Sequence, residues 1–115
     1  MKVLLIHLKR TEYLDDLLLA LTQVGVYDPV ILEALGGQDR LLSEVPIFAG
    51  LMVGEGKRSE LHRIILAAIE DESVADRILR ALSDGGIDWE AEDLGTLVVL
   101  PVERWIGRRG AKSGA

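Results

Sequence analysis

The fold is decided by residues 61–69, which read Leu-His-Arg-Ile-Ile-Leu-Ala-Ala-Ile. A short run this apolar predicts a β-strand with both faces buried. Successive side chains of a strand point to opposite faces, so Ile64 and Leu66 fall on one face and Ile65 on the other. The strand therefore needs cover on both sides.

Three further strands are predicted: two precede this one in the sequence, at residues 3–8 and 30–35, and one follows it, at residues 96–102. Two helical stretches separate them and give the order βαββαβ. That order folds most simply as an α+β, ferredoxin-like sandwich. We therefore expect a four-stranded antiparallel sheet with two helices on one face.

The two helices are placed by leucine spacing and by capping residues. The first is expected to follow an N-cap at Thr11 and to end at Gly25. The second is expected to have Ser73 as its cap, with Asp76 supporting the first turn, and to end at Gly85.

Residues 1–106 are predicted to form one domain, followed by a disordered tail at residues 107–115. Within the domain, residues 38–59 form a long connection between the second and third strands. A connection of this length in a small domain is usually functional. Its apolar content suggests that part of it folds over a surface as a short helix.

The sheet face without helices is expected to be apolar, because the strands carry aliphatic side chains on both faces. Such a face would expose about 300–500 Å², which is comparable to the largest patches that monomers tolerate. Covering it would stabilise each subunit by about 10 kcal/mol before ordering costs. Self-association into a closed ring or dimer is the expected outcome.

Composition excludes several classes of function. The 115-residue chain has no cysteine, which excludes a disulfide scaffold, thiolate zinc sites and cysteine nucleophiles. Its net charge of −6 would repel phosphate backbones, so we expect no nucleic-acid partner. Its apolar runs are too short for a bilayer, and we expect no membrane insertion and a cytoplasmic location.

Two segments carry a resemblance to a known family. Residues 13–26, Tyr-Leu-Asp-Asp-Leu-Leu-Leu-Ala-Leu-Thr-Gln-Val-Gly-Val, resemble the first helix of the PII nitrogen-regulatory family. Residues 99–104, Val-Leu-Pro-Val-Glu-Arg, are similar to the last strand of that family. Residues 44–51 resemble a PII-like branch with an atypical long loop. The spacing of all elements extends the resemblance over about residues 1–109.

The resemblance implies a homotrimer that signals by binding a small effector in clefts between subunits. The implied effector is an adenine nucleotide (ADP, ATP or AMP), in some members with 2-oxoglutarate, and the long loop then engages a target protein, a transporter or an enzyme. Residues 83–90 are acidic where the family has a basic, Gly-rich loop, and their carboxylates would repel phosphate. A structural or interaction trimer without nucleotide binding therefore stays open.

The resemblance also implies site residues. Effector binding is assigned to glycines and cations: Gly36, Gly37, Lys57, Arg58, Arg104, Arg108 and Arg109. Glycines bring backbone amides close to a ligand, and guanidinium groups suit phosphate oxygens. Partner contact is assigned to loop residues: Gln38, Arg40, Pro46, Phe48 and Met52. An ordinary strand-end turn and solvated loop charges remain the alternatives.

No catalytic or metal-binding constellation is found in the sequence. His7 and His62 lie on predicted strands, but no acidic residue is spaced to complete a metal site, which favours interface or surface histidines. Ser59, Glu60 and His62 fail as a hydrolytic set because adjacent strand residues point to opposite faces. We therefore expect a protein that is not an enzyme; a small ferredoxin-fold isomerase or oxygenase is the alternative.

Overall fold

The secondary-structure elements follow the predicted order in a computed structural model, which describes residues 1–44 and 61–108. The strands are β1 (Lys2–Leu8), β2 (Val30–Ala34), β3 (His62–Ile69) and β4 (Gly95–Pro101). The helices are α1 (Leu14–Gln23), α2 (Gly37–Glu44) and α4 (Ser73–Asp84), and a 3-10 turn, η1 (Thr11–Tyr13), precedes α1.

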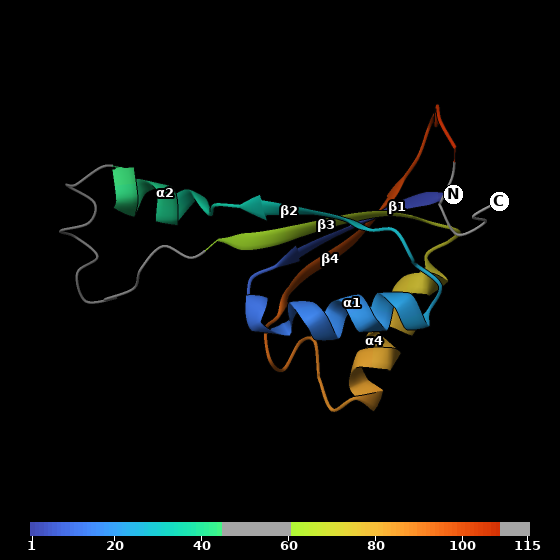
Figure 1. Cartoon of the computed structure of the whole chain (residues 1–115), viewed down its shortest axis with the longest axis horizontal. Coiled ribbons are helices and arrows are strands. Elements are labelled where there is room, and N and C mark those ends of the chain that lie inside the picture. The colour runs from blue at the N-terminus through green and yellow to red at the C-terminus, as the bar shows by residue number, and fades with distance from the viewer. Residues whose placement is uncertain (45–60, 109–115) are drawn as a thin grey trace.

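The four strands form one sheet in the order β2-β3-β1-β4, and all neighbouring strands are antiparallel. Helices α1 and α4 lie side by side on the same face of this sheet (Figure 1). The predicted α+β, ferredoxin-like sandwich is therefore confirmed.

The core lies between the sheet and these two helices and is aliphatic. In β1, Leu4 and Ile6 are fully buried and pair with Ala67 and Ile65 of β3. Among the described residues, no polar or charged residue is buried. The largest fully buried side chains are Leu4, Ile6, Leu8, Leu17, Leu21, Ile65, Ile78 and Leu94.

The opposite face of the sheet, here called the open face, is also apolar. Residues paired across antiparallel strands share a face, so the register assigns its members. Neither α1 nor α4 covers it (Figure 1). Val30, Leu32 and Leu100 are 55%, 47% and 41% exposed. The open face consists of Val3, Leu5, His7, Val30, Leu32, Ala34, His62, Ile64, Leu66, Ala68, Thr96, Val98 and Leu100.

The helix starts differ from the prediction. Thr11 belongs to η1, and no side chain caps the start of η1 or of α1. Ser73 is the first residue of α4 and not its cap. The Asp71 carboxylate accepts hydrogen bonds from the backbone N–H of Ser73, at 2.8 Å, and from its hydroxyl. Asp71 therefore satisfies the first free N–H group of α4, a role that sequence spacing gave to Ser73.

Part of the long connection is helical, because α2 includes residues 38–44. The Gly36 carbonyl accepts the Arg40 backbone N–H at 2.9 Å and so starts this helix. The remaining loop residues, 45–59, lie outside the described residues. Of the predicted tail, Gly107 and Arg108 are described, and residues 109–115 lie outside.

Within residues 1–44 and 61–108, no helix combines the length and the apolar character needed to cross a bilayer.

Candidate functional site

A cavity of about 740 Å³ opens at the end of the sheet where β2 begins and β3 ends. It lies between the connection from α1 to β2, the start of α4 and the segment that follows β4. This volume is within the range of small-molecule sites. Its floor is aliphatic, and its polar and aromatic lining comes from Tyr27, Asp28, Glu70, Arg77, Trp105 and Arg108.

Two arginines give this cavity its capacity to bind an anion. Within the described part of the chain, no hydrogen bond or ion pair engages the guanidinium groups of Arg77 and Arg108, but the charge of Arg77, after the hydrogen bonds from Ser73, lowers the pKa of the nearby Asp71. Trp105 is held in place because its ring N–H donates to the Gly107 carbonyl at 3.0 Å. The carboxylates of Asp28 and Glu70 in the same wall oppose the two positive charges. The lining therefore suits a ligand with both an anionic and a planar or apolar part.

The structure places only one of the predicted effector residues, Arg108, at this cavity. Arg104 is exposed in the segment after β4 and is not part of the lining. Gly36 and Gly37 follow the far end of β2, whereas the cavity is at the end where β2 begins with Val30. Lys57, Arg58 and Arg109 lie outside the described residues.

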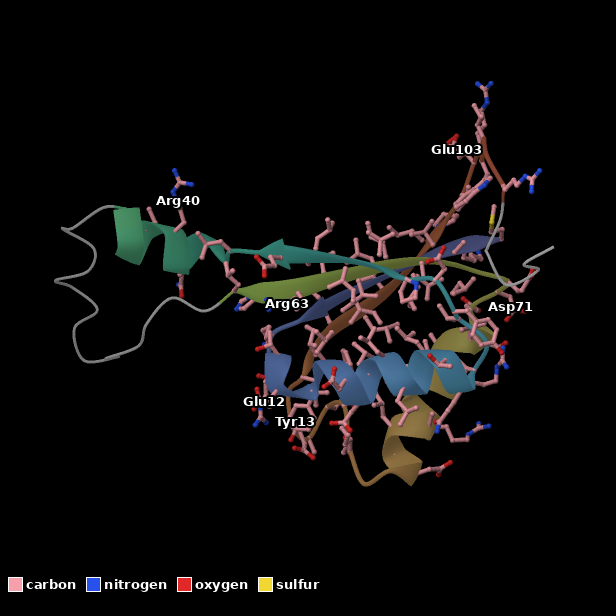
Figure 2. The ribbon with its side chains drawn as sticks, viewed as in Figure 1. Glu12, Tyr13, Arg40, Arg63, Asp71 and Glu103 are labelled. Atoms are coloured by element: carbon pink, nitrogen blue, oxygen red, sulfur yellow. The ribbon has the colours of Figure 1, made fainter. Side chains whose placement is uncertain are left out.

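Those predicted effector residues that the structure describes therefore do not converge within one chain. Arg40 lies on α2, the helix that begins at Gly37, and Glu103 is the residue before Arg104 beyond β4. These two labelled residues lie at opposite ends of the molecule (Figure 2). Of the predicted partner-contact residues, Gln38 and Arg40 lie on α2 and are exposed. Pro46, Phe48 and Met52 lie outside the described residues.

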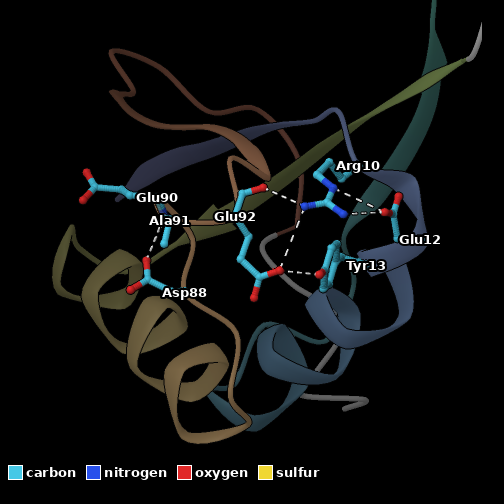
Figure 3. Close-up of polar contacts among 7 residues, drawn as sticks. All are labelled: Arg10, Glu12, Tyr13, Asp88, Glu90, Ala91 and Glu92. Carbon is cyan, nitrogen blue, oxygen red and sulfur yellow. Dashed lines mark hydrogen bonds and ion pairs between the residues drawn. The ribbon is translucent and has the colours of Figure 1, made fainter. Parts of the chain in front are cut away.

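The acidic stretch before β4 is held against η1 by polar contacts (Figure 3). The Tyr13 hydroxyl donates to the Glu92 carboxylate, which raises the pKa of Tyr13. The Arg10 guanidinium donates to the Glu92 backbone carbonyl at 2.9 Å and to the Glu12 carboxylate at 2.9 Å. These contacts leave the guanidinium of Arg10 engaged with acceptors of its own chain.

The same stretch is ordered from within. The Asp88 carboxylate accepts the backbone N–H groups of Glu90 and Ala91 at 3.1 and 2.9 Å (Figure 3). The Trp89 ring N–H donates to the Gly95 carbonyl at 3.1 Å. Residues 83–94 contain no lysine or arginine. This loop therefore presents carboxylates and no cationic side chain of its own.

The two histidines meet on the open face. His7 pairs with Ile64, and His62 stands two residues before Ile64 on the same face of β3. The His7 Nε2 and His62 Nδ1 atoms are 2.8 Å apart, and the ring centroids are 4.9 Å apart with a 40° tilt. Burial, and then the neighbouring charges of His62 and Lys9, lower the pKa of His7. Among the described residues, no group of three or more metal-ligating side chains is found.

Sequence reasoning missed the convergence of Tyr27, Arg77 and Trp105. The available signal was topological, because in a βαββαβ sandwich the connection into β2 and the start of α4 meet at one end of the sheet. It also missed the contact between His7 and His62. That contact depends on the register of β1 and β3, which the structure supplies.

No known protein family matches this chain, and comparison with curated proteins finds no match.

Proposed function

We propose that this protein is a PII-like regulator that works as a homotrimer. It binds a small effector in clefts between its subunits and controls a target protein through residues 38–59. The observation that carries this proposal is the apolar open face. The resemblance of residues 13–26 and 99–104 to PII proteins supplies the oligomeric state and the regulatory role.

The open face supports assembly because its exposed members are aliphatic. Its polar members among the described residues are His7, His62 and Thr96. Covering about 300–500 Å² of such a surface contributes about 10 kcal/mol per subunit before ordering costs. Copies of one chain satisfy this need in a closed, symmetric ring.

The separation of the predicted effector residues supports a cleft between subunits. Gly36 and Arg108 are at opposite ends of β2, which spans about 15 Å at about 3.3 Å per residue. Within one chain, a ligand held in the cavity beside Arg108 does not lie against Gly36, which is not part of the lining. In a ring, the end of β2 in one subunit and the C-terminal segment of its neighbour form a shared site.

An adenine nucleotide (ADP, ATP or AMP) is the proposed effector, with the guanidinium of Arg108 on a phosphate. The target protein, a transporter or an enzyme, contacts the loop that begins with α2, where Gln38 and Arg40 are exposed. Regulation of nitrogen metabolism is the role that the resemblance implies.

Two measurements test this proposal. Light scattering at micromolar concentration is expected to give three times the chain mass of 12.6 kDa. Calorimetry with ADP, ATP, AMP and 2-oxoglutarate is expected to give heat with at least one of them, and less with Arg108→Ala. A stable single-chain particle overturns the trimer. Absence of heat from all four ligands overturns nucleotide binding.

The acidic loop before β4 favours a second candidate, a structural or interaction trimer of the same fold that binds no nucleotide. Residues 83–94 offer carboxylates and no cationic side chain. In this case, alanine at Arg104, Arg108 and Arg109 leaves the capture of a target protein unchanged, while the mass remains that of a trimer.

A further inference from the structure

The contact between His7 and His62 brings two metal-ligating groups together. Both side chains project from neighbouring strands of the sheet, so the backbone fixes their spacing. The Nε2 atom of His7 and the Nδ1 atom of His62 are 2.8 Å apart. In this arrangement one ring nitrogen donates a proton and the other accepts it.

The spacing is close to that of two ligands on one metal ion. Imidazole nitrogens bind zinc at about 2.0–2.1 Å, so two of them at angles of 90–110° are about 2.9–3.4 Å apart. Small rotations of the side chains of His7 and His62 cover the difference. The shared proton then moves to the outer nitrogen of its own ring, and the ion takes its place between the two inner nitrogens.

The electrostatic surroundings of the pair allow a cation to bind. The neutral imidazole is the form of histidine that binds metals. Lys9 is the nearby cation that opposes binding, and its ammonium group forms an ion pair with Asp93 at 3.2 Å. His7 and His62 both lie towards the end of the open face, next to the strand ends.

We propose that His7 and His62 together bind one divalent transition-metal ion that prefers imidazole ligands, such as Cu²⁺, Ni²⁺ or Zn²⁺. The site is bidentate, and water or a group from outside the pair completes the coordination. Both ligands come from one chain, so the site needs no ligand from a second subunit or from the effector. For a pair of nitrogen ligands, we expect binding to be tightest for Cu²⁺ and absent for Mg²⁺.

The test is a titration of the full chain with CuCl₂, NiCl₂, ZnCl₂ and MgCl₂, followed by calorimetry. The chain contains two histidines and no cysteine, so imidazole coordination can come only from this pair. We expect one Cu²⁺ per chain. His7→Gln and His62→Gln are each expected to weaken binding at least about tenfold, because the second ligand acts at high effective concentration only when the first is bound.

The double variant H7Q/H62Q is the matched control, since it measures the background from surface carboxylates and the N-terminal amine. In a bidentate site, each single variant loses nearly as much affinity as the double variant. Additive losses would overturn the proposal, because they would show two independent histidines. Equal binding by all variants would overturn it as well.

A spectroscopic readout keeps the test valid if a variant folds poorly. Electron paramagnetic resonance of the unsubstituted chain with Cu²⁺ is expected to show hyperfine coupling to two imidazole nitrogens. Coupling to none or to one would contradict the proposed site. Light scattering of the same metal-free samples reports the trimer separately, so failure of the metal site and failure of the proposed assembly are distinguishable.

Discussion

Replacing Leu5 with glutamate on the open face is expected to dissociate the proposed trimer without unfolding the chain. Leu5 lies at the middle of β1 and pairs with Leu66 on one side and with Val98 on the other. It is absent from the buried core, which uses the alternate positions Leu4 and Ile6. A charge at Leu5 therefore enters the proposed interface and leaves the packing under the helices intact.

The expected effect follows from the surface that Leu5 contributes. Burying a leucine stabilises by about 1.5–3 kcal/mol, and an unpaired buried carboxylate costs several kcal/mol. Leu5 is mostly covered already in one chain, so the buried carboxylate supplies most of the effect, and we take at least about 2 kcal/mol per subunit. Over three subunits this gives about 6 kcal/mol, or about 10⁴-fold in the association constant.

Sedimentation velocity over a concentration series measures this change, and circular dichroism verifies the fold. Leu19→Glu is the matched control: Leu19 is 58% exposed on α1, and the substitution adds the same charge. We expect Leu5→Glu to sediment as a single chain and Leu19→Glu as the unsubstituted protein. An unchanged association constant for Leu5→Glu would refute the open face as the interface.

Three further predictions concern stability and titration. Gly95→Ala is expected to destabilise the fold by at least about 3 kcal/mol in urea titrations, because Gly95 has a φ of +154° and an added Cβ would lie 1.9 Å from the His7 carbonyl oxygen; a normal unfolding midpoint would contradict this geometry. Glu92→Gln is expected to lower the raised pKa of Tyr13, measured by ultraviolet titration of the phenol, because the carboxylate that disfavours phenolate is removed; an unchanged pKa would exclude the contact. The free energy of unfolding is expected to fall as the pH drops below 6.5, the ordinary pKa of histidine, because His7 has a lowered pKa and binds fewer protons in the folded state than in the unfolded state. His7→Gln should reduce this slope, and the same slope in both proteins would assign it to other groups.

The fold could be predicted from the sequence because the apolar runs are unambiguous. Residues 61–69 and 96–102 carry aliphatic side chains on both faces, and the structure shows them as β3 and β4 with an uncovered face. Helix caps were predicted less well. Thr11 and Asp71 are both common capping types, and which residue caps depends on backbone angles that the sequence does not reveal.

The candidate site was less accessible to sequence reasoning, because it depends on contacts between distant segments. Arg108 could be singled out as a basic residue near the C-terminus, but its placement beside Arg77 depends on how the segment after β4 returns towards α4. The side-chain contact between His7 and His62 depends on the register of β1 and β3, which apolar runs do not define. The trimer and its effector remain predictions.

A sheet that is largely aliphatic on both faces has a consequence for folding. Sliding β1 by one residue would exchange Leu4, Ile6 and Leu8 for Val3, Leu5 and His7 under the helices, so the clear loss of hydrophobic burial would be at Leu8. Other contacts must therefore penalise such a slip. The Lys9 and Arg10 backbone N–H groups both donate to the Leu94 carbonyl, and Gly95 next to it admits the β1 backbone at a distance no side chain allows. Alignment of the strands thus depends on a few backbone contacts at one end of β1 and on keeping the His7 imidazole out of the core in place of Leu8, and errors there would give misaligned chains.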